Sequence, residues 1–173
     1  VSPTYASEIQ EDDEMGAGLK DVLRDRTDDL YGIMNGVDYG VWDPEKDKLL
    51  EENFSAADLS GKLENKKQLL EKVGLPFDET VPVIGIISRI ADQKGFDLIS
   101  KAIKDLVGLK AQVVILGTGD PEYHKLLEKW QKDHPKNIAV ALKFDESLAH
   151  LIEAGSDMFL MPSKYEPSGL NQM

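Results

Sequence analysis

Two cations stand close together in the stretch SRIADQKG (88–95), where four residues separate Arg89 from Lys94. The stretch follows an apolar run and leads into a run with helical periodicity. The N-terminus of a helix presents unpaired backbone N–H groups and favours an anion. Two cations at such a point predict a site for a small phosphorylated ligand, although the same residues also suit an ordinary solvated surface.

Three other polar stretches follow apolar runs in the same way. GTGDP (117–121) has glycines that permit close approach of the backbone to a ligand, KFDES (143–147) has an aromatic ring beside polar groups, and YEPSGLNQM (165–173) has a carboxylate beside a turn signal. Each has a simpler explanation: a tight turn, core packing of Phe144, and solvent exposure of Glu166. In open α/β sheets, however, ligands bind at the carboxyl ends of the strands, so the four stretches are expected to meet.

The elements that would bring them together alternate along the second half of the chain. VPVIGIIS (81–88) is a continuous β-branched run, typical of a strand buried on both faces. The predicted order is strand 81–88, helix 94–108, strand 111–117, helix 121–134, strand 137–144, helix 146–155 and strand 157–163. Gly155 is expected to cap the last of these helices. This alternation predicts an α/β fold with a doubly wound, parallel, Rossmann-like sheet and right-handed crossovers.

The first 80 residues are less regular. Helices are predicted at 18–30 and 59–75, with a short strand at 31–37 that ends in an Asn-Gly turn signal. We expect residues 1–30 to connect to something upstream and residues 31–173 to belong to the α/β domain.

Charge and composition exclude several classes of function. The net charge is −12, and residues 1–80 carry 20 acidic and 9 basic side chains, whereas residues 81–173 carry 12 and 11. No segment offers the basic face that binding to nucleic acid requires. No apolar run is long enough to span a membrane, and the sequence has no cysteine. The three histidines lack metal-ligand spacing, so no metal site is predicted.

The order of several motifs carries a family resemblance. The stretches SPTYA, NGVD, SR-x4-KG and EPSGL-x-Q occur in that order along essentially the whole chain. The sequence thus resembles the bacterial glycogen synthase and plant starch synthase family, retaining glucosyltransferases of the GT-B fold. The resemblance implies transfer of glucose from ADP-glucose to the non-reducing end of an α-1,4-glucan, with release of ADP and without a metal or other cofactor.

The resemblance also implies roles for residues that match the family's motifs. Arg89 and Lys94 match the pair that neutralises the departing pyrophosphate. Phe144 matches a ring that stacks on adenine, and the backbone near Asp145 would meet the base edge. The remaining positions expected to bind the substrate are Gly117, Ser168, Gly169, Leu170 and Asn171. The N–H groups of the last three would open a predicted helix that cradles the phosphates.

Glu166 matches the first acid of a Glu-x7-Glu type of motif. A nucleophilic role is one alternative, since retaining glycosidases use a carboxylate in that way. The resemblance favours a front-face displacement, in which Glu166 holds donor-sugar hydroxyls. Two departures from the family pattern are Ser168, where many bacterial relatives have Cys, and Lys164-Tyr165, which replaces a common Arg-Phe.

Parts of the family pattern have no counterpart in this sequence. The Lys-x-Gly-Gly-Leu motif of an N-terminal glucan-binding domain is absent, and the second Glu would fall at position 174. We expect the acceptor to bind through that N-terminal domain, the donor domain to be incomplete, and the chain alone to be inactive. The location would be cytoplasmic in a bacterium and plastidic in a plant. A UDP-glucose-dependent transferase related to sucrose synthase, or a non-catalytic nucleotide-binding module, are the alternatives.

Overall fold

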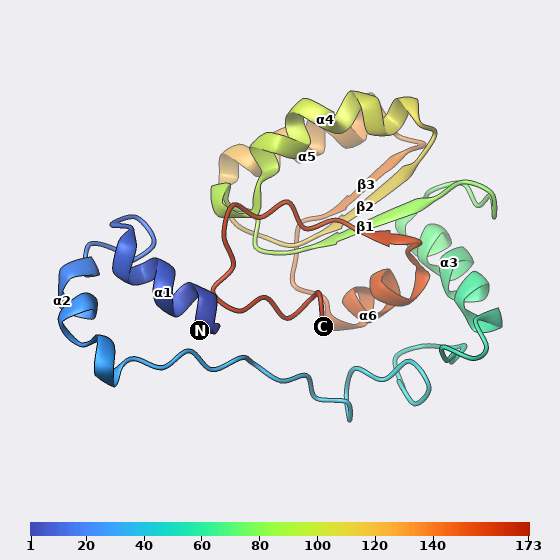
Figure 1. Cartoon of the computed structure of the whole chain (residues 1–173). Helices are drawn as coiled ribbons and strands as arrows, with labels where there is room; N and C mark the ends of the chain where they lie inside the picture. Colours follow the sequence, from blue (N-terminus) through green and yellow to red (C-terminus); the bar gives the residue numbers. More distant parts are fainter. The chain divides into compact units, whose positions relative to one another are not determined.

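The computed structural model describes residues 1–173, which form two compact units (Figure 1). Unit 1 comprises Val1–Tyr39 together with Tyr165–Met173, and unit 2 comprises Gly40–Lys164. The predicted boundary near residue 30 remains a prediction. The compact units divide the chain after Tyr39 and again after Lys164.

Unit 2 is built on a four-stranded parallel sheet in the order β3-β2-β1-β4. The strands are β1 (Val83–Ile87), β2 (Gln112–Leu116), β3 (Ile138–Ala141) and β4 (Met158–Phe159). β1 pairs with β2 over its whole length, but with β4 only through Ile84 and Gly85. β-branched side chains dominate the central strands because they pack well on a pleated surface that is buried on both faces.

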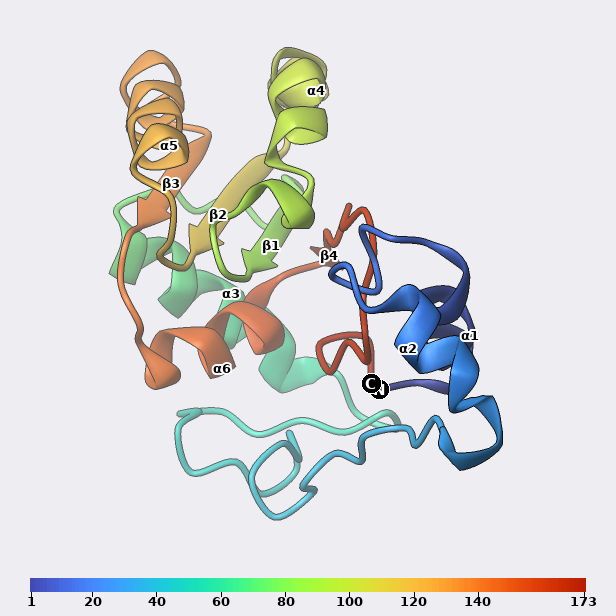
Figure 2. The same cartoon turned by 90° about the vertical axis from the view of Figure 1, so that its left-hand side faces the viewer.

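Helices cover both faces of this sheet (Figure 2). They are α3 (Ser60–Val73), α4 (Phe96–Gly108), α5 (Pro121–Asp133) and α6 (Glu146–Gly155). α4 and α5 lie on one face, and α3 and α6 lie on the other. Side chains alternate along a strand, so Val113 and Ile115 of β2 enter the core under α4 and α5, whereas Val114 and Leu116 enter the core under α3 and α6.

The strands and helices predicted between residues 81 and 163 are confirmed, with ends that differ by a few residues. The predicted role of Gly155 is wrong. Its φ is not positive, and Ser156 takes the C-cap position. A Cβ at Gly155 would lie 2.7 Å from the carbonyl oxygen of Asn65 in α3. Glycine is required here because α3 and α6 pack closely, not because the helix ends.

The order in which strands are added to the sheet changes side between β3 and β4. β1, β2 and β3 follow one another outward, and β4 then returns to the other side of β1. Ligands of open α/β sheets bind at such a switch point, outside the carboxyl ends of the strands. In unit 2 this point lies where residues 88–95 leave β1 and residues 160–164 leave β4.

Unit 1 contains little regular structure. Its elements are α1 (Pro3–Glu11), α2 (Lys20–Asp25) and the single 3-10 turn η1 (Thr27–Asp29). α1 was not predicted, although Ser2 is its N-cap and accepts a hydrogen bond from the Tyr5 N–H. The helix predicted at 18–30 is shorter than expected: α2 ends at Asp25, and only the 3-10 turn η1 follows it.

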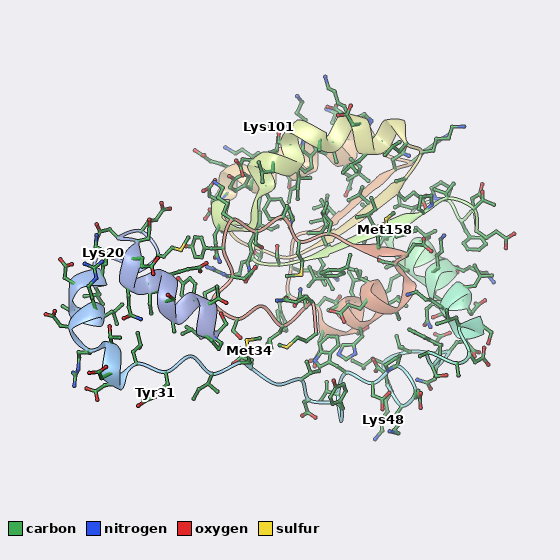
Figure 3. The ribbon with its side chains drawn as sticks, viewed as in Figure 1. Lys20, Tyr31, Met34, Lys48, Lys101 and Met158 are labelled. Carbon is green, nitrogen blue, oxygen red and sulfur yellow. The ribbon has the colours of Figure 1, made fainter.

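The strand predicted at 31–37 is wrong. The segment is extended, but it has no partner strand, and Ile33 N–H donates one hydrogen bond to the carbonyl of Val1 at 2.7 Å. Tyr31 and Ile33 are 75% and 73% exposed, and Figure 3 shows Tyr31 and Met34 along this segment. β-branched and aromatic residues favour a strand only where a neighbouring strand and a covering layer exist. In the whole structure, no helix is both long and apolar enough to cross a membrane.

Candidate functional site

The residues predicted to form a site divide equally between the two units. Those in unit 2 follow strands: Arg89 and Lys94 follow β1, Gly117 follows β2, and Phe144 and Asp145 follow β3. Those in unit 1 lie in its C-terminal segment and are Glu166, Ser168, Gly169, Leu170 and Asn171.

Within unit 2, main-chain hydrogen bonds join the loops that follow β1 and β2. Ile90 N–H donates to the Thr118 carbonyl at 2.9 Å, and Asp120 N–H donates back to the Ile90 carbonyl at 2.7 Å. On the other side, Gly117 N–H donates to the Ala141 carbonyl of β3 at 3.1 Å. These bonds continue the ladder of the sheet beyond its strands, so the loops are tied to each other and to β3.

This joining requires glycine at two positions. A Cβ on Gly117 would overlap the carbonyl oxygen of Ser88, and a Cβ on Gly119 would overlap the carbonyl oxygen of Ile90. Neither glycine has a positive φ. The two glycines of the GTG stretch are therefore needed because the backbones of two loops touch at these positions.

Arg89 precedes a tight turn at the switch point, and Lys94 is the last residue of that turn. Arg89 is exposed, and its guanidinium donates to Gln93 Oε1 at 3.0 Å. Lys94 ends the 3-10 turn η2 (Asp92–Lys94), and Gly95 then adopts a left-handed φ of 74° as the N-cap of α4. α4 has no side-chain cap at this end, so its first N–H groups and both cations favour an anion here.

His124 contributes to this region and was not predicted. Its Nε2 accepts a hydrogen bond from the Gly119 N–H at 3.0 Å. Nε2 can accept this bond only where it carries no proton. The contact holds the loop after β2 from the side of α5. No sequence pattern identifies it, since a histidine four residues into a helix has many possible partners.

Phe144 and Asp145 lie next to each other but differ in what surrounds them. Phe144 is 89% exposed. Asp145 is the N-cap of α6, where its Oδ1 accepts from the Leu148 N–H at 2.9 Å, and its Oδ2 lies 2.7 Å from Lys143 Nζ. Lys143 and the Leu148 N–H hold the pKa of Asp145 below its usual value. The Asp145 carboxylate thus has a structural role, while the Phe144 ring is open to solvent.

In unit 1, the segment 165–173 is held by two other motifs of the sequence. Asn35 of NGVD donates its N–H to Ser168 Oγ at 3.3 Å and its side-chain amide to the Ser168 carbonyl at 3.4 Å. Ser2 N–H donates to the carbonyl of Pro167 at 2.6 Å, and the Tyr5 and Tyr165 rings stack with centroids 6.1 Å apart.

These contacts fix the backbone on both sides of Glu166, which is half-buried. Gly169 lies in irregular chain, Leu170 in a bend and Asn171 in a turn, where Met173 N–H donates to the Leu170 carbonyl at 3.0 Å. The helix predicted to begin at these residues does not form within residues 165–173. A single turn has too few internal hydrogen bonds to sustain a helix by itself.

A second polar cluster of unit 2 lies under α6 and was also missed. The His150 ring stacks on Trp42 with centroids 3.7 Å apart, and its Nδ1 lies 2.5 Å from Asp47 Oδ2. The His150 side chain is 1% exposed, and its Nε2 has no hydrogen-bond partner. A cavity of about 180 Å³ adjoins the cluster, and burial raises the pKa of Glu153 in its wall. The cluster fastens residues 40–58 to the sheet layer.

No group of three or more His, Asp or Glu side chains is arranged to hold a metal ion. At the switch point, Arg89, Lys94 and the backbone N–H groups at the start of α4 could bind a charged ligand. What this arrangement can do chemically is bind and polarise an anion.

Comparison with known proteins gives this geometry a context. Residues 67–173 match the family model described as "Glycosyl transferases group 1". The glycogen synthases of Thermosipho melanesiensis and Anaeromyxobacter dehalogenans (strain 2CP-1) are each 50% identical to the chain over all 173 residues. The chain spans 36% of the length of each of these relatives.

A solved structure is also similar. The catalytic domain of starch synthase IV from Arabidopsis thaliana, bound to ADP and acarbose, matches 99% of this chain with a TM-score of 0.91 and 40% identity. The match covers 36% of that chain. The fold class predicted from the alternating pattern and the family resemblance drawn from the motifs are confirmed by these comparisons.

Proposed function

The chain belongs to the group 1 glycosyl transferases, and we propose that it forms the donor-binding part of a glycogen or starch synthase. In this proposal the whole protein transfers glucose from ADP-glucose to the non-reducing end of an α-1,4-glucan, with retention of configuration. The names of the 50% identical relatives and the ADP and acarbose bound to the similar starch synthase support it.

One observation carries the proposal: Arg89 and Lys94 flank a fixed turn at the switch point, directly before the uncapped N-terminus of α4. Breaking the anomeric bond of a nucleotide sugar leaves negative charge on the diphosphate. Donors and cations that are already in place stabilise such charge without reorganising. Arg89 can grip two phosphate oxygens through its planar guanidinium, and Lys94 adds a compact point charge.

The other predicted residues receive roles in the same proposal. The exposed ring of Phe144 is suited to stack on the adenine base, with the backbone near Asp145 at the base edge, and Gly117 contacts the donor through its backbone. Glu166 holds hydroxyls of the donor sugar.

The rest of the C-terminal segment and the accessory groups complete the proposal. Ser168 and the N–H groups of Gly169, Leu170 and Asn171 contact the diphosphate. No metal or other cofactor is required, because the two cations supply the positive charge. The predicted location, cytoplasmic in a bacterium or plastidic in a plant, remains a prediction.

The test is a calorimetric or NMR titration of the chain with ADP. Replacing Arg89 with Ala removes the guanidinium fork, so ADP should bind roughly 10- to 100-fold more weakly. The matched control is Arg26→Ala, which removes an exposed guanidinium 3.9 Å from Asp29 in unit 1. Equal ADP affinity for the Arg89→Ala variant and the unmodified chain would refute the phosphate assignment.

A second titration tests the nucleotide. The proposal requires ADP to bind more tightly than UDP, since the family resemblance is to ADP-glucose-dependent synthases. Tighter binding of UDP would favour the alternative transferase that uses UDP-glucose. Replacement of Lys94 with Ala should weaken both nucleotides, whereas Lys101→Ala, on the outer face of α4 (Figure 3), should weaken neither.

A further inference from the structure

The turn η2 joins the two cations assigned to the phosphates. Its internal bonds are few: Lys94 N–H donates to the Ala91 carbonyl and Gly95 N–H donates to the Asp92 carbonyl, both at 3.0 Å. One turn of 3-10 helix has poor hydrogen-bond geometry and does not hold itself rigid. Contacts from other elements must therefore keep both cations in position.

The side chain of Asp92 receives contacts from two such elements. Lys164 Nζ, in the chain that leaves β4, lies 2.6 Å from Asp92 Oδ2. The Tyr123 hydroxyl, in the first turn of α5, donates to Asp92 Oδ1 at 3.0 Å. The hydrogen bonds from Lys164 and Tyr123 hold the pKa of Asp92 below its usual value, and the bond from Lys164 has the larger effect. The Asp92 side chain is 65% exposed, but both of its carboxylate oxygens are bonded, one to Lys164 and the other to Tyr123, so more than a single solvated ion pair holds it.

The main chain adds two more contacts between the same segments. Lys164 N–H donates to the Gln93 carbonyl at 2.9 Å. The carbonyl of Pro162 lies so close to Gly95 that a Cβ on Gly95 would overlap it. Figure 1 shows the chain that leaves β4, in red, running back past the start of α4. The exit of β4 is thus attached to η2 at side-chain and main-chain level.

We infer that Asp92 and Lys164 form a clamp that fixes η2 against the exit of β4 and thereby positions Arg89 and Lys94 for the diphosphate of a nucleotide-sugar donor. The clamp is a property of the free protein, whereas its ligand rests on the function proposed above. Lys164 acts through the turn and does not touch the ligand. Its ammonium group also lies 3.7 Å from Asp97 Oδ1, so two carboxylates already offset its charge.

The first test needs no nucleotide. Asp92→Asn keeps the size of the side chain and an acceptor for Tyr123 but loses the charge. Hydrogen exchange at the amides of Gly95 and Lys164 should become at least about 10-fold faster in this variant, because their protection depends on the attached turn. Exchange at Ile86 in β1 should not change, which separates a local opening from general destabilisation.

A matched control for this test is Asp43→Asn. It breaks an ion pair of similar length in the same unit, Lys46 Nζ to Asp43 Oδ2 at 2.9 Å, between residues three apart in the chain. This control should leave exchange at Gly95 and Lys164 unchanged. Equal exchange rates in the Asp92→Asn variant and the unmodified chain would overturn the clamp.

The second test is a double-mutant cycle read by ADP affinity. Asp92→Asn and Lys164→Met should each weaken ADP binding about 10-fold, and the double variant should also be about 10-fold weaker rather than 100-fold, because either change opens the same clamp. Lys164→Arg keeps the charge and should restore affinity to within about 3-fold. That rescue distinguishes positioning from a general loss of structure.

The outcomes separate the two proposals. If Lys164 bound phosphate directly, Asp92→Asn would leave ADP affinity equal or higher and the two effects would multiply, which would overturn the positioning role. If the unmodified chain did not bind ADP, the proposed function and the ligand named here would both fall. The exchange measurement would still decide whether the clamp exists.

Discussion

The two units hold the residues predicted to bind a ligand by different means. In unit 2, the loops that carry Arg89 and Gly117 are joined by main-chain hydrogen bonds and lie on two buried apolar clusters. In unit 1, the only buried apolar side chains are Tyr5 and Ala6, and contacts from Asn35 and Tyr5 hold the segment with Glu166. The loop that carries Arg89 is therefore backed by the core of unit 2, whereas the segment that carries Glu166 lies in a unit with a much smaller apolar core.

The largest effect should come from filling the space between the joined loops. Gly119→Val places a branched side chain against the carbonyl of Ile90, so the loops after β1 and β2 must separate, at a cost of at least about 4 kcal/mol in the free energy of unfolding. Gly36→Ala in unit 1 is the control, since a Cβ there meets nothing within 4 Å. Urea unfolding followed by far-UV circular dichroism and tryptophan fluorescence measures both. A Gly119→Val variant as stable as the unmodified chain would show that the two loops do not need to touch.

Removal of a core side chain should have the next largest effect. Leu69 in α3 is 0% exposed, so Leu69→Ala should lower the free energy of unfolding by about 3–4 kcal/mol through lost transfer energy and an unfilled cavity. Ile33→Ala in unit 1, at a position 73% exposed, should change it by less than about 0.5 kcal/mol. The same urea titrations apply, and similar losses in both variants would show that unit 1 has a core comparable to that of unit 2.

Two ion pairs of similar length, one buried in unit 2 and one exposed in unit 1, should differ in their contribution to stability. Lys66 Nζ lies 2.9 Å from Asp157 with its side chain 5% exposed, and Lys20 Nζ lies 2.8 Å from Asp13, whose side chain is 72% exposed. Asp157→Ala strands a buried ammonium and should cost about 2–3 kcal/mol. Asp13→Ala should cost less than about 0.5 kcal/mol, because water already solvates that pair. Thermal unfolding at low and high salt distinguishes the two, since only the exposed pair is well screened.

The smallest expected effect is a dependence on pH within unit 2. Burial raises the pKa of Glu153 above its unfolded value, so the folded protein binds this proton more tightly and the carboxylate destabilises the fold as pH rises through the raised pKa. Glu153→Gln should therefore stabilise the chain slightly at neutral pH and have little effect at acidic pH. Urea midpoints at both pH values test this, with the exposed Glu128→Gln as control. A loss of stability at neutral pH would contradict the assignment.

The sequence predicted the sheet of unit 2 well for a physical reason. Runs such as VPVIGIIS and AQVVILG are apolar on both faces, and only a central strand of a parallel sheet accepts such a pattern. The helices between them show the apolar stripe that a covering layer requires. Each of these patterns is local, so it can be recognised without knowledge of the partner.

The predictions that were wrong concern residues whose structure depends on a contact with another part of the chain. Residues 31–37 have the composition of a strand, but no strand lies beside them. Gly155 has the position of a helix cap, but it is required by the approach of α3. His124, Asn35 and the Asp92–Lys164 pair act through contacts with residues that are distant in the chain or differ in element, which a local pattern does not contain.

By itself, the sequence determined the α/β class, the order of elements in unit 2, the family resemblance, and the candidates Arg89, Lys94 and Glu166. The tertiary structure decided how the turn between the two cations is held, why Gly117 and Gly119 must be glycine, and which motifs fix the backbone beside Glu166. This difference follows from how far along the chain each interaction reaches. Periodicity and turn chemistry act over a few residues, whereas hydrogen bonds between loops depend on which strand ends the fold brings together.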